Sequence, residues 1–276
     1  MWCAAPGAPH GRQAAARLRA AGPRGTAPVP VGNARSGSAR SVTPPAQAEP
    51  AGQGLPPSLD AFVGRERELS RLRTLLRSSR LLTLTGPGGV GKTRLALELA
   101  GSVRGARAGR AQWVALDSLR DGALLPQALA AALGVRERGG RAGAEALVHA
   151  LGTRTMLVVL DNCEHLADAC AQLAATLLAR CPRLRILATS RETLRVPGEV
   201  VFRVAELSLT PTGEDHDLAG LLRSEAVRLF LERARTSDAT FELGRGEART
   251  VAEICRRLDG LPLASNWRRA ARAHSR

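Results

Sequence analysis

One segment constrains the fold of this chain more than any other. Residues Gly86–Thr93 read Gly-Pro-Gly-Gly-Val-Gly-Lys-Thr and match the pattern of a phosphate-binding loop. An apolar run that favours a strand, Leu81–Thr85, comes directly before the loop, and a stretch with helical spacing, Thr93–Val103, follows it. Because Lys92 is the only lysine of the chain, a chance match to the pattern is on the order of one in a thousand. The sequence therefore predicts a strand, a phosphate-binding loop and a helix, in that order.

Short apolar runs alternate with helical stretches through the middle of the chain. The predicted strands are Leu81–Thr85, Trp113–Leu116, Met156–Leu160, Leu184–Ala188 and Val200–Val204. The predicted helices between them are Thr93–Val103, Leu124–Leu133, Ala144–Leu151 and Leu166–Arg180. This alternation is typical of βαβ units, and nearly continuous apolar strands are expected where helices cover both faces of a sheet. We therefore expect an α/β fold, namely the three-layer sandwich of a P-loop NTPase with a parallel sheet in its middle layer.

Residues 1–57 differ in composition from the rest of the chain. They are rich in Ala, Gly, Pro and Arg and contain no acidic residue before Glu49. Such a segment buries too little apolar surface to offset the entropy cost of ordering, so we predict that it is disordered. The alternatives are a transit peptide, whose helix the frequent Pro and Gly would break, and a start codon assigned too far upstream.

Helical spacing also appears on both sides of the predicted sheet. Before the sheet, an amphipathic helix is indicated by Leu69, Leu72, Leu75 and Leu76. After Pro211 the predicted strands stop, and two helices follow, Ser224–Thr236 and Gly246–Leu258. The predicted organisation is a disordered basic segment at 1–57, a nucleotide-binding domain at 58–210, a partial helical domain at 211–264 and a basic tail at 265–276.

The net charge of +15 is concentrated at the two ends of the chain. Residues 1–58 carry +5 and residues 265–276 carry +4, which leaves +6 for everything between them. Basic tails bind polyanions weakly and without sequence choice, so a module that binds nucleic acid through its termini is kept only as an alternative function. No stretch reaches the length of about 18 apolar residues that a membrane span needs. Five widely spaced cysteines, an odd number, indicate a reducing compartment, and we expect a cytoplasmic protein.

The predicted loop has the chemistry needed to hold nucleotide phosphates. Its glycines let successive backbone N–H groups turn inward, and the helix that follows adds its positive N-terminal end. Lys92 is expected to reach the β- and γ-phosphates, and the Thr93 hydroxyl is expected to bind Mg²⁺. The predicted binding residues of the loop are Gly86, Pro87, Gly88, Gly89, Val90, Gly91, Lys92 and Thr93. ATP or ADP with Mg²⁺ is therefore the predicted ligand.

Three further residues are candidates for catalysis because they follow predicted strands. Asp161 ends an apolar run and is expected to bind Mg²⁺ directly or through water. Glu164 is a candidate base for activating water, or else an acid that favours the N-terminus of the next helix. Arg191 is placed to sense the γ-phosphate, with a cap of a surface turn as the alternative. Lys92, Asp161, Glu164 and Arg191 form the predicted catalytic set, and we expect any hydrolysis to be slow.

Taken together, the motifs resemble the NB-ARC type of STAND NTPase. More narrowly, they resemble the ATPase segment of large bacterial transcriptional regulators of the LuxR and SARP types. The motifs that carry the resemblance are Val63–Glu66, Gly86–Thr93, Leu157–His165, Ala188–Glu192 and Gly260–Ala264. The resemblance implies a switch, with ADP bound at rest and ATP bound on activation, that gates assembly or an output domain. It also implies self-association through the nucleotide-binding and helical domains, and DNA contact only through domains outside this chain.

The same resemblance assigns further residues to the nucleotide. Val63 and Arg65 are expected near the adenine, and Pro262 is expected to close over the base. After Ala264 the sequence departs from the family pattern, which continues with an apolar helix. We therefore expect a truncated or frame-shifted product in which Leu229, Phe230, Val251, Ile254 and Leu258 lie uncovered. A P-loop hydrolase that turns over ATP steadily is the remaining alternative, and the orientation of Glu164 would distinguish it.

Overall fold

The structure of the chain is a computed structural model. It describes residues 54–57, 60–104, 110–135, 143–209 and 218–262, all of which belong to the unit Ala48–Arg276. The predictions made for residues 1–53 and for the basic tail at 265–276 lie outside these described residues.

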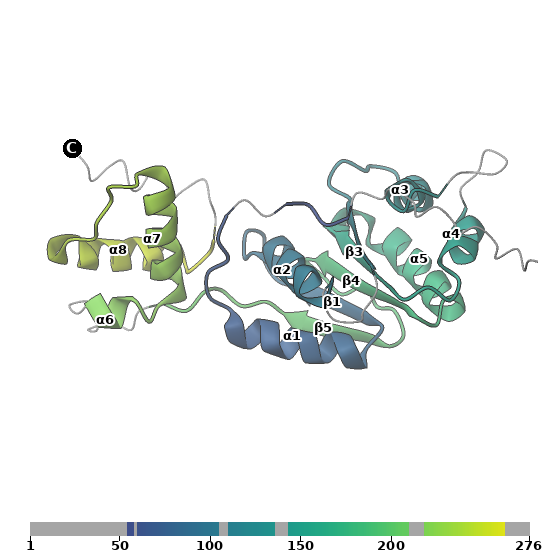
Figure 1. Cartoon of the computed structure of the whole chain (residues 1–276), viewed down its shortest axis with the longest axis horizontal. Helices are drawn as coiled ribbons and strands as arrows, with labels where there is room; N and C mark the ends of the chain where they lie inside the picture. The colour runs from purple at the N-terminus through teal and green to yellow at the C-terminus, as the bar shows by residue number, and fades with distance from the viewer. Residues whose placement is uncertain (1–53, 58–59, 105–109, 136–142, 210–217, 263–276) are drawn as a thin grey trace, which may run out of the picture. The chain divides into compact units, whose positions relative to one another are not determined.

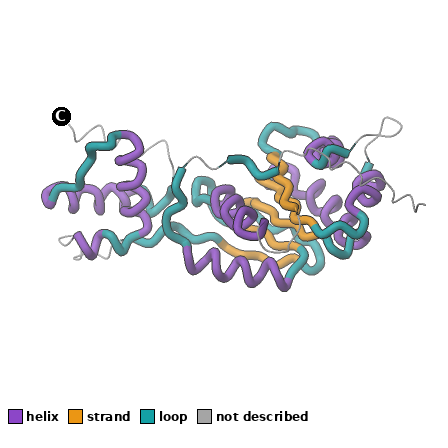
Figure 2. The backbone as a smooth tube through the Cα atoms, in the orientation of Figure 1, coloured by secondary structure: helices purple, strands orange, loops and turns teal. Residues whose placement is uncertain are grey.

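Five parallel strands form the central sheet (Figures 1 and 2). They are β1 (Leu81–Thr85), β2 (Arg110–Ala115), β3 (Met156–Asp161), β4 (Leu184–Ser190) and β5 (Glu199–Arg203). The strand order is β2-β3-β4-β1-β5, so β4 lies between β1 and β3. In register, Leu84 pairs with Thr189 and Leu160 pairs with Ala188. The carboxyl ends of β1, β4 and β3 therefore meet side by side at one edge of the sheet.

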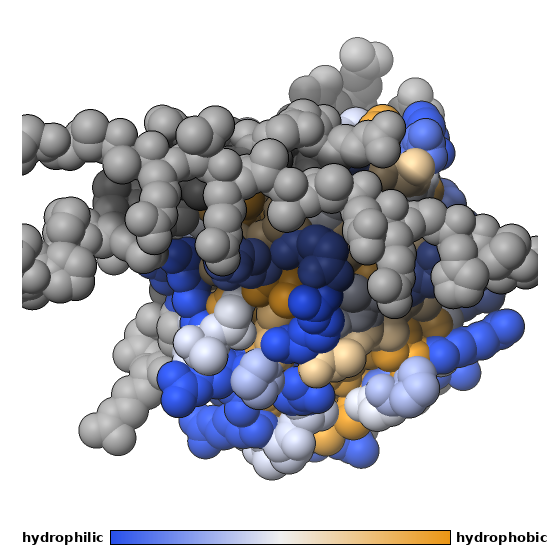
Figure 3. All heavy atoms as spheres, turned by 90° about the vertical axis from the view of Figure 1, so that its right-hand side faces the viewer, coloured by the Kyte–Doolittle hydropathy of each residue, from blue (hydrophilic) through white to orange (hydrophobic). Residues whose placement is uncertain are grey.

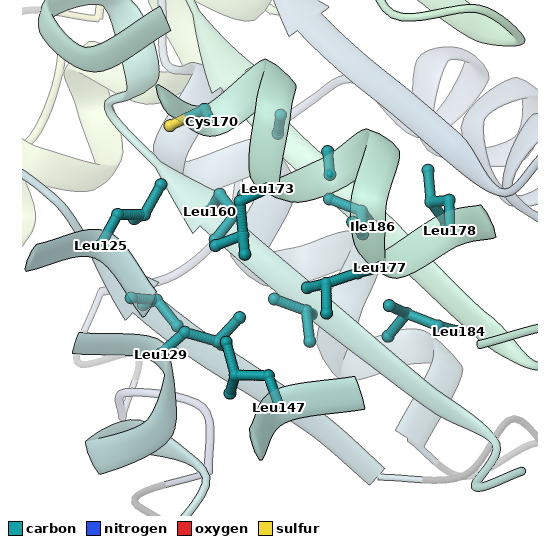
Figure 4. Packing of buried hydrophobic residues seen from close by; sticks show 14 of the residues in the cluster. Leu125, Leu129, Leu147, Leu160, Cys170, Leu173, Leu177, Leu178, Leu184 and Ile186 are labelled. Carbon is teal, nitrogen blue, oxygen red and sulfur yellow. The ribbon is translucent and has the colours of Figure 1, made fainter. Parts of the chain in front are cut away.

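Helices cover both faces of this sheet and confirm the predicted three-layer α/β fold. They are α1 (Glu66–Ser78), α2 (Lys92–Arg104), α3 (Leu125–Ala132), α4 (Ala144–Leu151) and α5 (Ala167–Arg180), with short 3₁₀ turns η1 (Gly122–Leu124) and η2 (Cys163–Leu166). Helices α1 and α2 pack on one face, against residues such as Leu82 and Leu187. Helices α3, α4 and α5 pack on the other face, where leucines of the three helices meet Leu160 and Ile186 (Figure 4).

The alternation of side chains along each strand explains these two cores. In β1 every residue is buried, with Leu82 and Leu84 packing toward α1 and α2 and Leu81 toward the opposite face. The same alternation in β3 places the buried Asp161 on the face of Leu157 and Val159, which is the face of α2. A strand buried on both faces therefore delivers its terminal carboxylate to the beginning of α2.

Three helices follow the sheet, namely α6 (Leu218–Leu221), α7 (Glu225–Ser237) and α8 (Arg245–Arg257). Ser224 caps α7, since its Oγ accepts a hydrogen bond from the Val227 N–H. The expectation that Leu229, Phe230, Val251, Ile254 and Leu258 lie uncovered was wrong. The first three are buried and the other two are half-buried, because α7 and α8 pack against each other and against Leu207 and Leu221. The four residues of α6 carry too little periodicity to be predicted.

The surface is mostly hydrophilic on the face that Figure 3 shows. Hydrophilic side chains predominate among the coloured atoms there, with apolar atoms visible between them. Within the described residues, no helix is long and apolar enough to cross a membrane.

Candidate functional site

The predicted phosphate-binding loop lies between the carboxyl end of β1 and the N-terminus of α2. Gly89 and Gly91 have φ angles of 78° and 94°, a region that strongly favours glycine. At Gly86 a Cβ would lie 2.8 Å from the Val204 carbonyl oxygen, so a larger residue would displace the backbone beyond β5. Helix α2 begins at Lys92, and its first turn points toward the loop. The loop therefore has the tight backbone and the helix N-terminus that an anion cradle requires.

Lys92 is buried within this loop. Its exposed fraction is 9%, and its Nζ donates hydrogen bonds to the carbonyl oxygens of Gly86 (2.9 Å) and Pro87 (3.0 Å). Burial lowers the pKa of Lys92, as does the nearby Arg191, whereas the charges of Glu164 and Asp161 oppose this shift. The amine therefore lies across the loop, where the carbonyl oxygens of Gly86 and Pro87 hold it.

Two threonine hydroxyls hold the Asp161 carboxylate. Thr93 Oγ1 donates to Asp161 Oδ1 at 2.8 Å, and Thr189 Oγ1 donates to the same oxygen at 2.6 Å. Burial raises the pKa of Asp161, and the two hydroxyl hydrogen bonds oppose that rise. The Asn162 N–H in turn donates to Thr189 Oγ1 at 2.9 Å. The two predicted magnesium ligands, Thr93 and Asp161, are thus in direct contact.

Thr189 was not assigned a role from the sequence. It lies on the face of β4 that also carries Leu187, which points toward α2, and it is almost fully buried. The sequence offered one signal for its contact with Asp161, namely a hydroxyl residue at the carboxyl end of the strand that lies between β1 and β3. That signal is usable only when the strand order is known, because β4 comes later in the chain than both strands that it separates.

The oxygen atoms of Thr93 and Asp161 fit a magnesium ion. Mg²⁺ prefers hard oxygen ligands and is usually held by one or two carboxylates together with substrate phosphates and water. Among the described residues, no group of three or more His, Cys, Asp or Glu side chains could hold a metal ion.

Glu164 and Arg191 are paired with each other at the mouth of the loop. Arg191 Nε donates to Glu164 Oε1 at 3.1 Å, and the exposed side-chain fractions are 66% for Arg191 and 19% for Glu164. A Cβ built on Gly88 would lie 3.7 Å from Arg191 Nη2, so the guanidinium lies beside the loop. Glu164 belongs to the η2 turn, and its Oε2 atom is buried with no hydrogen-bond partner in the part of the chain that the structure describes.

Two of the three residues that the resemblance assigned to adenine, Arg65 and Pro262, lie beside the same loop. Arg65 Nη2 donates to the Val90 carbonyl at 2.7 Å, and Pro262 Cγ is 3.5 Å from where a Cβ on Gly91 would be. Val63 is half-buried against the cluster formed by α7 and α8. Contact of these residues with adenine stays a prediction.

Glu225 was not predicted to belong to this region. Its Oε1 accepts a hydrogen bond from the Arg65 backbone N–H at 2.6 Å. The two residues are 160 positions apart, and a glutamate at the start of a helix is ordinary, so the sequence offered no signal for this contact.

The fold and the site together define a class of protein. A parallel sheet carries a phosphate-binding loop after β1 and a lysine within that loop. The carboxylate at the end of β3 accepts a hydrogen bond from the threonine of the loop. Such an arrangement is that of a P-loop NTPase domain.

Comparison with known proteins narrows this class. The chain belongs to the STAND NTPases, since the family model described as Novel STAND NTPase 1 matches residues 57–270. The match includes the loop, Asp161, Arg191 and the α6–α8 region.

Curated relatives come from Mycobacterium tuberculosis. One, named as a candidate HTH-type transcriptional regulator, is 44% identical over 204 residues, which are 74% of this chain and 21% of the relative. Another, named only as an uncharacterized protein, is 41% identical over 206 residues, which are 75% of this chain and 49% of that protein. The chain thus spans about a fifth to a half of the length of these relatives. Among solved structures, Cdc6p from Pyrobaculum aerophilum is similar in fold, with a TM-score of 0.51 at 18% identity, over 76% of this chain and 61% of that one.

Proposed function

We propose that this chain binds ATP or ADP with Mg²⁺ and acts as the switch domain of a signal-transduction or transcriptional regulator. The observation that carries the proposal is the hydrogen bond from Thr93 to Asp161, directly beside the loop that holds Lys92. A buried carboxylate that touches the loop hydroxyl has the position and the chemistry of a magnesium ligand.

Each residue of the site has a distinct part in this proposal. Lys92 places a positive charge against the β- and γ-phosphates, and the N–H groups of the loop and of α2 bind the phosphate oxygens. Thr93 and Asp161 hold the magnesium ion, which when bound would neutralise phosphate charge. Thr189 keeps the Asp161 carboxylate turned toward Thr93. Arg191, whose guanidinium lies beside Gly88, would contact the third phosphate of ATP.

A slow switch agrees better with the observed contacts than steady hydrolysis does. Glu164, the candidate base, accepts a hydrogen bond from Arg191. The Glu164 carboxylate oxygen that faces Arg191 is engaged in this pair, so Glu164 can turn toward an attacking water only when Arg191 moves away. We propose that the γ-phosphate of ATP attracts Arg191 and thereby releases Glu164. Steady hydrolysis would require Glu164 to be free without that movement.

The regulatory part of the proposal rests on relatives that are longer than this chain. The mycobacterial relative named as an HTH-type regulator suggests transcription, and DNA contact would come through regions outside this chain. Assembly of copies through the nucleotide-binding and helical regions, and a place in the cytoplasm, belong to the same proposal.

Nucleotide titrations test the proposal directly. Fluorescent ATP and ADP analogues, titrated with and without Mg²⁺, should bind the parent chain, and turnover should remain slow when nucleotide is in excess. Failure of both analogues to bind the folded protein would rule out nucleotide recognition. Rapid multiple turnover would instead favour the steady hydrolase.

A further inference from the structure

Arg65 combines features that a simple surface arginine would not have. Its exposed fraction is only 4%, and its φ angle of 61° places a residue with a side chain in the left-handed region. Its Nη2 donates to two carbonyl oxygens, that of Val90 in the phosphate-binding loop (2.7 Å) and that of Ala205 after β5 (2.9 Å). The side chain therefore joins the loop to the segment that leads into the helical region.

Glu225, the first residue of α7, fixes the backbone of Arg65. Its Oε1 accepts the Arg65 N–H at 2.6 Å, and its Oε2 accepts the Ser208 N–H at 3.2 Å. The Glu225 N–H donates to Ser208 Oγ at 3.1 Å, so carboxylate and backbone of Glu225 are both held. Each of the two carboxylate oxygens thus faces a backbone N–H, which ties α7 both to the turn before α1 and to the segment after β5.

Gly64 makes this close approach possible. A Cβ at Gly64 would lie 2.8 Å from Glu225 Oε1, and its φ angle is 77°. The sequence Gly64-Arg65 thus presents an unobstructed N–H to the carboxylate and then turns the guanidinium toward the loop. These contacts form one continuous path from α7 through Glu225 and Arg65 to Val90.

We propose that Arg65 and Glu225 are positioning residues that transmit the position of α7 to the phosphate-binding loop. Glu225 sets the Arg65 backbone, and the Arg65 guanidinium holds the Val90 carbonyl of the loop. A shift of α7 therefore changes the shape of the loop and the rate at which nucleotide leaves. The inference rests on the proposed nucleotide site and adds the helix that regulates it. By linkage, the free energy by which the present position of α7 strengthens nucleotide binding equals the free energy by which bound nucleotide stabilises that position of α7.

The energetic character of the contact suits a switch. Burial lowers the pKa of Arg65, and its Nη1 atom is buried without a hydrogen-bond partner in the described part of the chain. A left-handed backbone and an incompletely bonded buried guanidinium both cost free energy. If α7 moved away and Arg65 relaxed, these costs would be removed, which would offset part of the loss of the hydrogen bonds that hold α7 in its present position.

Substitution of Glu225 tests the path without touching the loop. We expect Glu225→Ala to weaken binding of a fluorescent ADP analogue at least about fivefold, the lower range of measured allosteric coupling, and the loss should appear mainly as faster release. Arg228→Gln is the matched control, because it removes only the exposed ion pair of the same helix with Glu66. In the Arg65→Ala background, Glu225→Ala should add nothing, since the guanidinium through which it acts is gone. Arg65→Lys, which retains one donor for the Val90 carbonyl, should restore part of the slow release.

A second measurement follows the loop itself. Reductive methylation labels Lys92, the only lysine, and the N-terminal α-amine, whose signal is distinguished because it persists in Lys92→Met. The methyl signals of Lys92 report on the loop by nuclear magnetic resonance. Glu225→Ala should shift these signals in the nucleotide-free protein, and Arg228→Gln should not. If Glu225→Ala fails to fold by circular dichroism, Glu225→Gln decides, because its NH₂ group replaces one carboxylate oxygen and cannot accept the N–H that faces that position.

The two measurements separate failure of the inference from failure of the proposed function. Unchanged ADP release together with unchanged Lys92 signals would overturn the path from α7 to the loop. Shifted Lys92 signals in a protein that binds no nucleotide would support the path and overturn the nucleotide site. Equal effects of Glu225→Ala and Arg228→Gln would also overturn the path from α7 to the loop, because the exposed ion pair of Arg228 with Glu66 does not belong to that path.

Discussion

Arg191 Nε lies 3.1 Å from Glu164 Oε1, so the candidate sensor and the candidate base of this site are bound to each other. The two residues come from different strand ends, Arg191 after β4 and Glu164 after β3. The ion pair is partly exposed, so water and any bound anion compete with Glu164 for the Arg191 guanidinium. A phosphate group with two negative charges is a stronger competitor than water.

Replacing Arg191 should affect the two nucleotides unequally. We predict that Arg191→Ala weakens ATP binding several-fold more than ADP binding, since only ATP offers a third phosphate to the guanidinium. Parallel titrations of both nucleotides with Mg²⁺ would measure the ratio. Equal losses for ATP and ADP would assign Arg191 to the fold of the turn after β4.

Removing the only lysine should abolish tight binding without unfolding the sheet. We predict that Lys92→Ala weakens binding of ATP and ADP by at least about tenfold, because the amine neutralises phosphate charge inside the loop. Lys92→Arg should not restore affinity, since a planar guanidinium differs in shape from an amine that bonds Gly86 and Pro87. Calorimetric titration with circular dichroism as a fold control decides the matter, and parent-like affinity in Lys92→Ala would exclude this loop.

The Asp161 carboxylate should act through magnesium. We predict that Asp161→Asn lowers nucleotide affinity when Mg²⁺ is present and has little effect in excess chelator. Thr189→Val is the companion variant, because it removes a hydrogen bond that holds the carboxylate but keeps the charge. It should give a smaller loss with the same dependence on Mg²⁺. A loss that is equal in chelator would identify Asp161 as structural.

Stability should depend on pH through Lys92. Its pKa is lowered in the folded state, so between that pKa and the ordinary lysine value of about 10.4 the unfolded chain binds more protons. The free energy of unfolding therefore gains a contribution that rises with pH in this window. Lys92→Met should lack it, and urea unfolding of both proteins at about pH 8 and about pH 10 would measure the difference. The chain contains no tyrosine, which simplifies the comparison. A constant difference between the two proteins would contradict the prediction.

The buried thiols should be unreactive while the protein is folded. Cys163, Cys170, Cys181 and Cys255 are all buried and free, and burial raises the pKa of Cys255 to about 12. A hydrogen bond with Cys170, together with burial, raises the pKa of Cys163. In a Cys3→Ser background, we predict that a thiol reagent modifies these four residues only as fast as the protein unfolds. Fast labelling in native buffer would show that one of these thiols becomes accessible.

Much of the fold follows from local sequence patterns. The bounds of β1 and α4 agree with prediction, and the loop lies where its motif placed it. Strand β2 begins three residues earlier than predicted, at Arg110, because polar residues at its start still pair with β3. The ends of β3 and β4 extend to Asp161 and Ser190, which predictions based on apolar runs alone could not include.

The contacts that complete the site are less accessible to sequence analysis. Lys92, Thr93 and Asp161 belong to motifs, and the structure brings them together, although their roles stay predictions. Thr189 depends on the strand order, and Glu225 meets Arg65 only through the packing of α7. The burial of the α7 and α8 faces was also mispredicted, since amphipathic helices that pair with each other look the same in sequence as helices awaiting another partner.

The position of β4 between β1 and β3 also has a consequence for synthesis of the protein on the ribosome. Thr93 and Asp161 are 68 residues apart, and β4, the strand that separates β1 from β3, is made after both of them. A nascent chain that ends before β4 has the loop and the carboxylate but lacks the strand that sets the spacing between them. Nucleotide cannot stabilise such a chain through the completed site, so early folding must proceed without help from the ligand. Under the proposed function, nucleotide would therefore begin to stabilise the chain only after β4 has joined the sheet between β1 and β3.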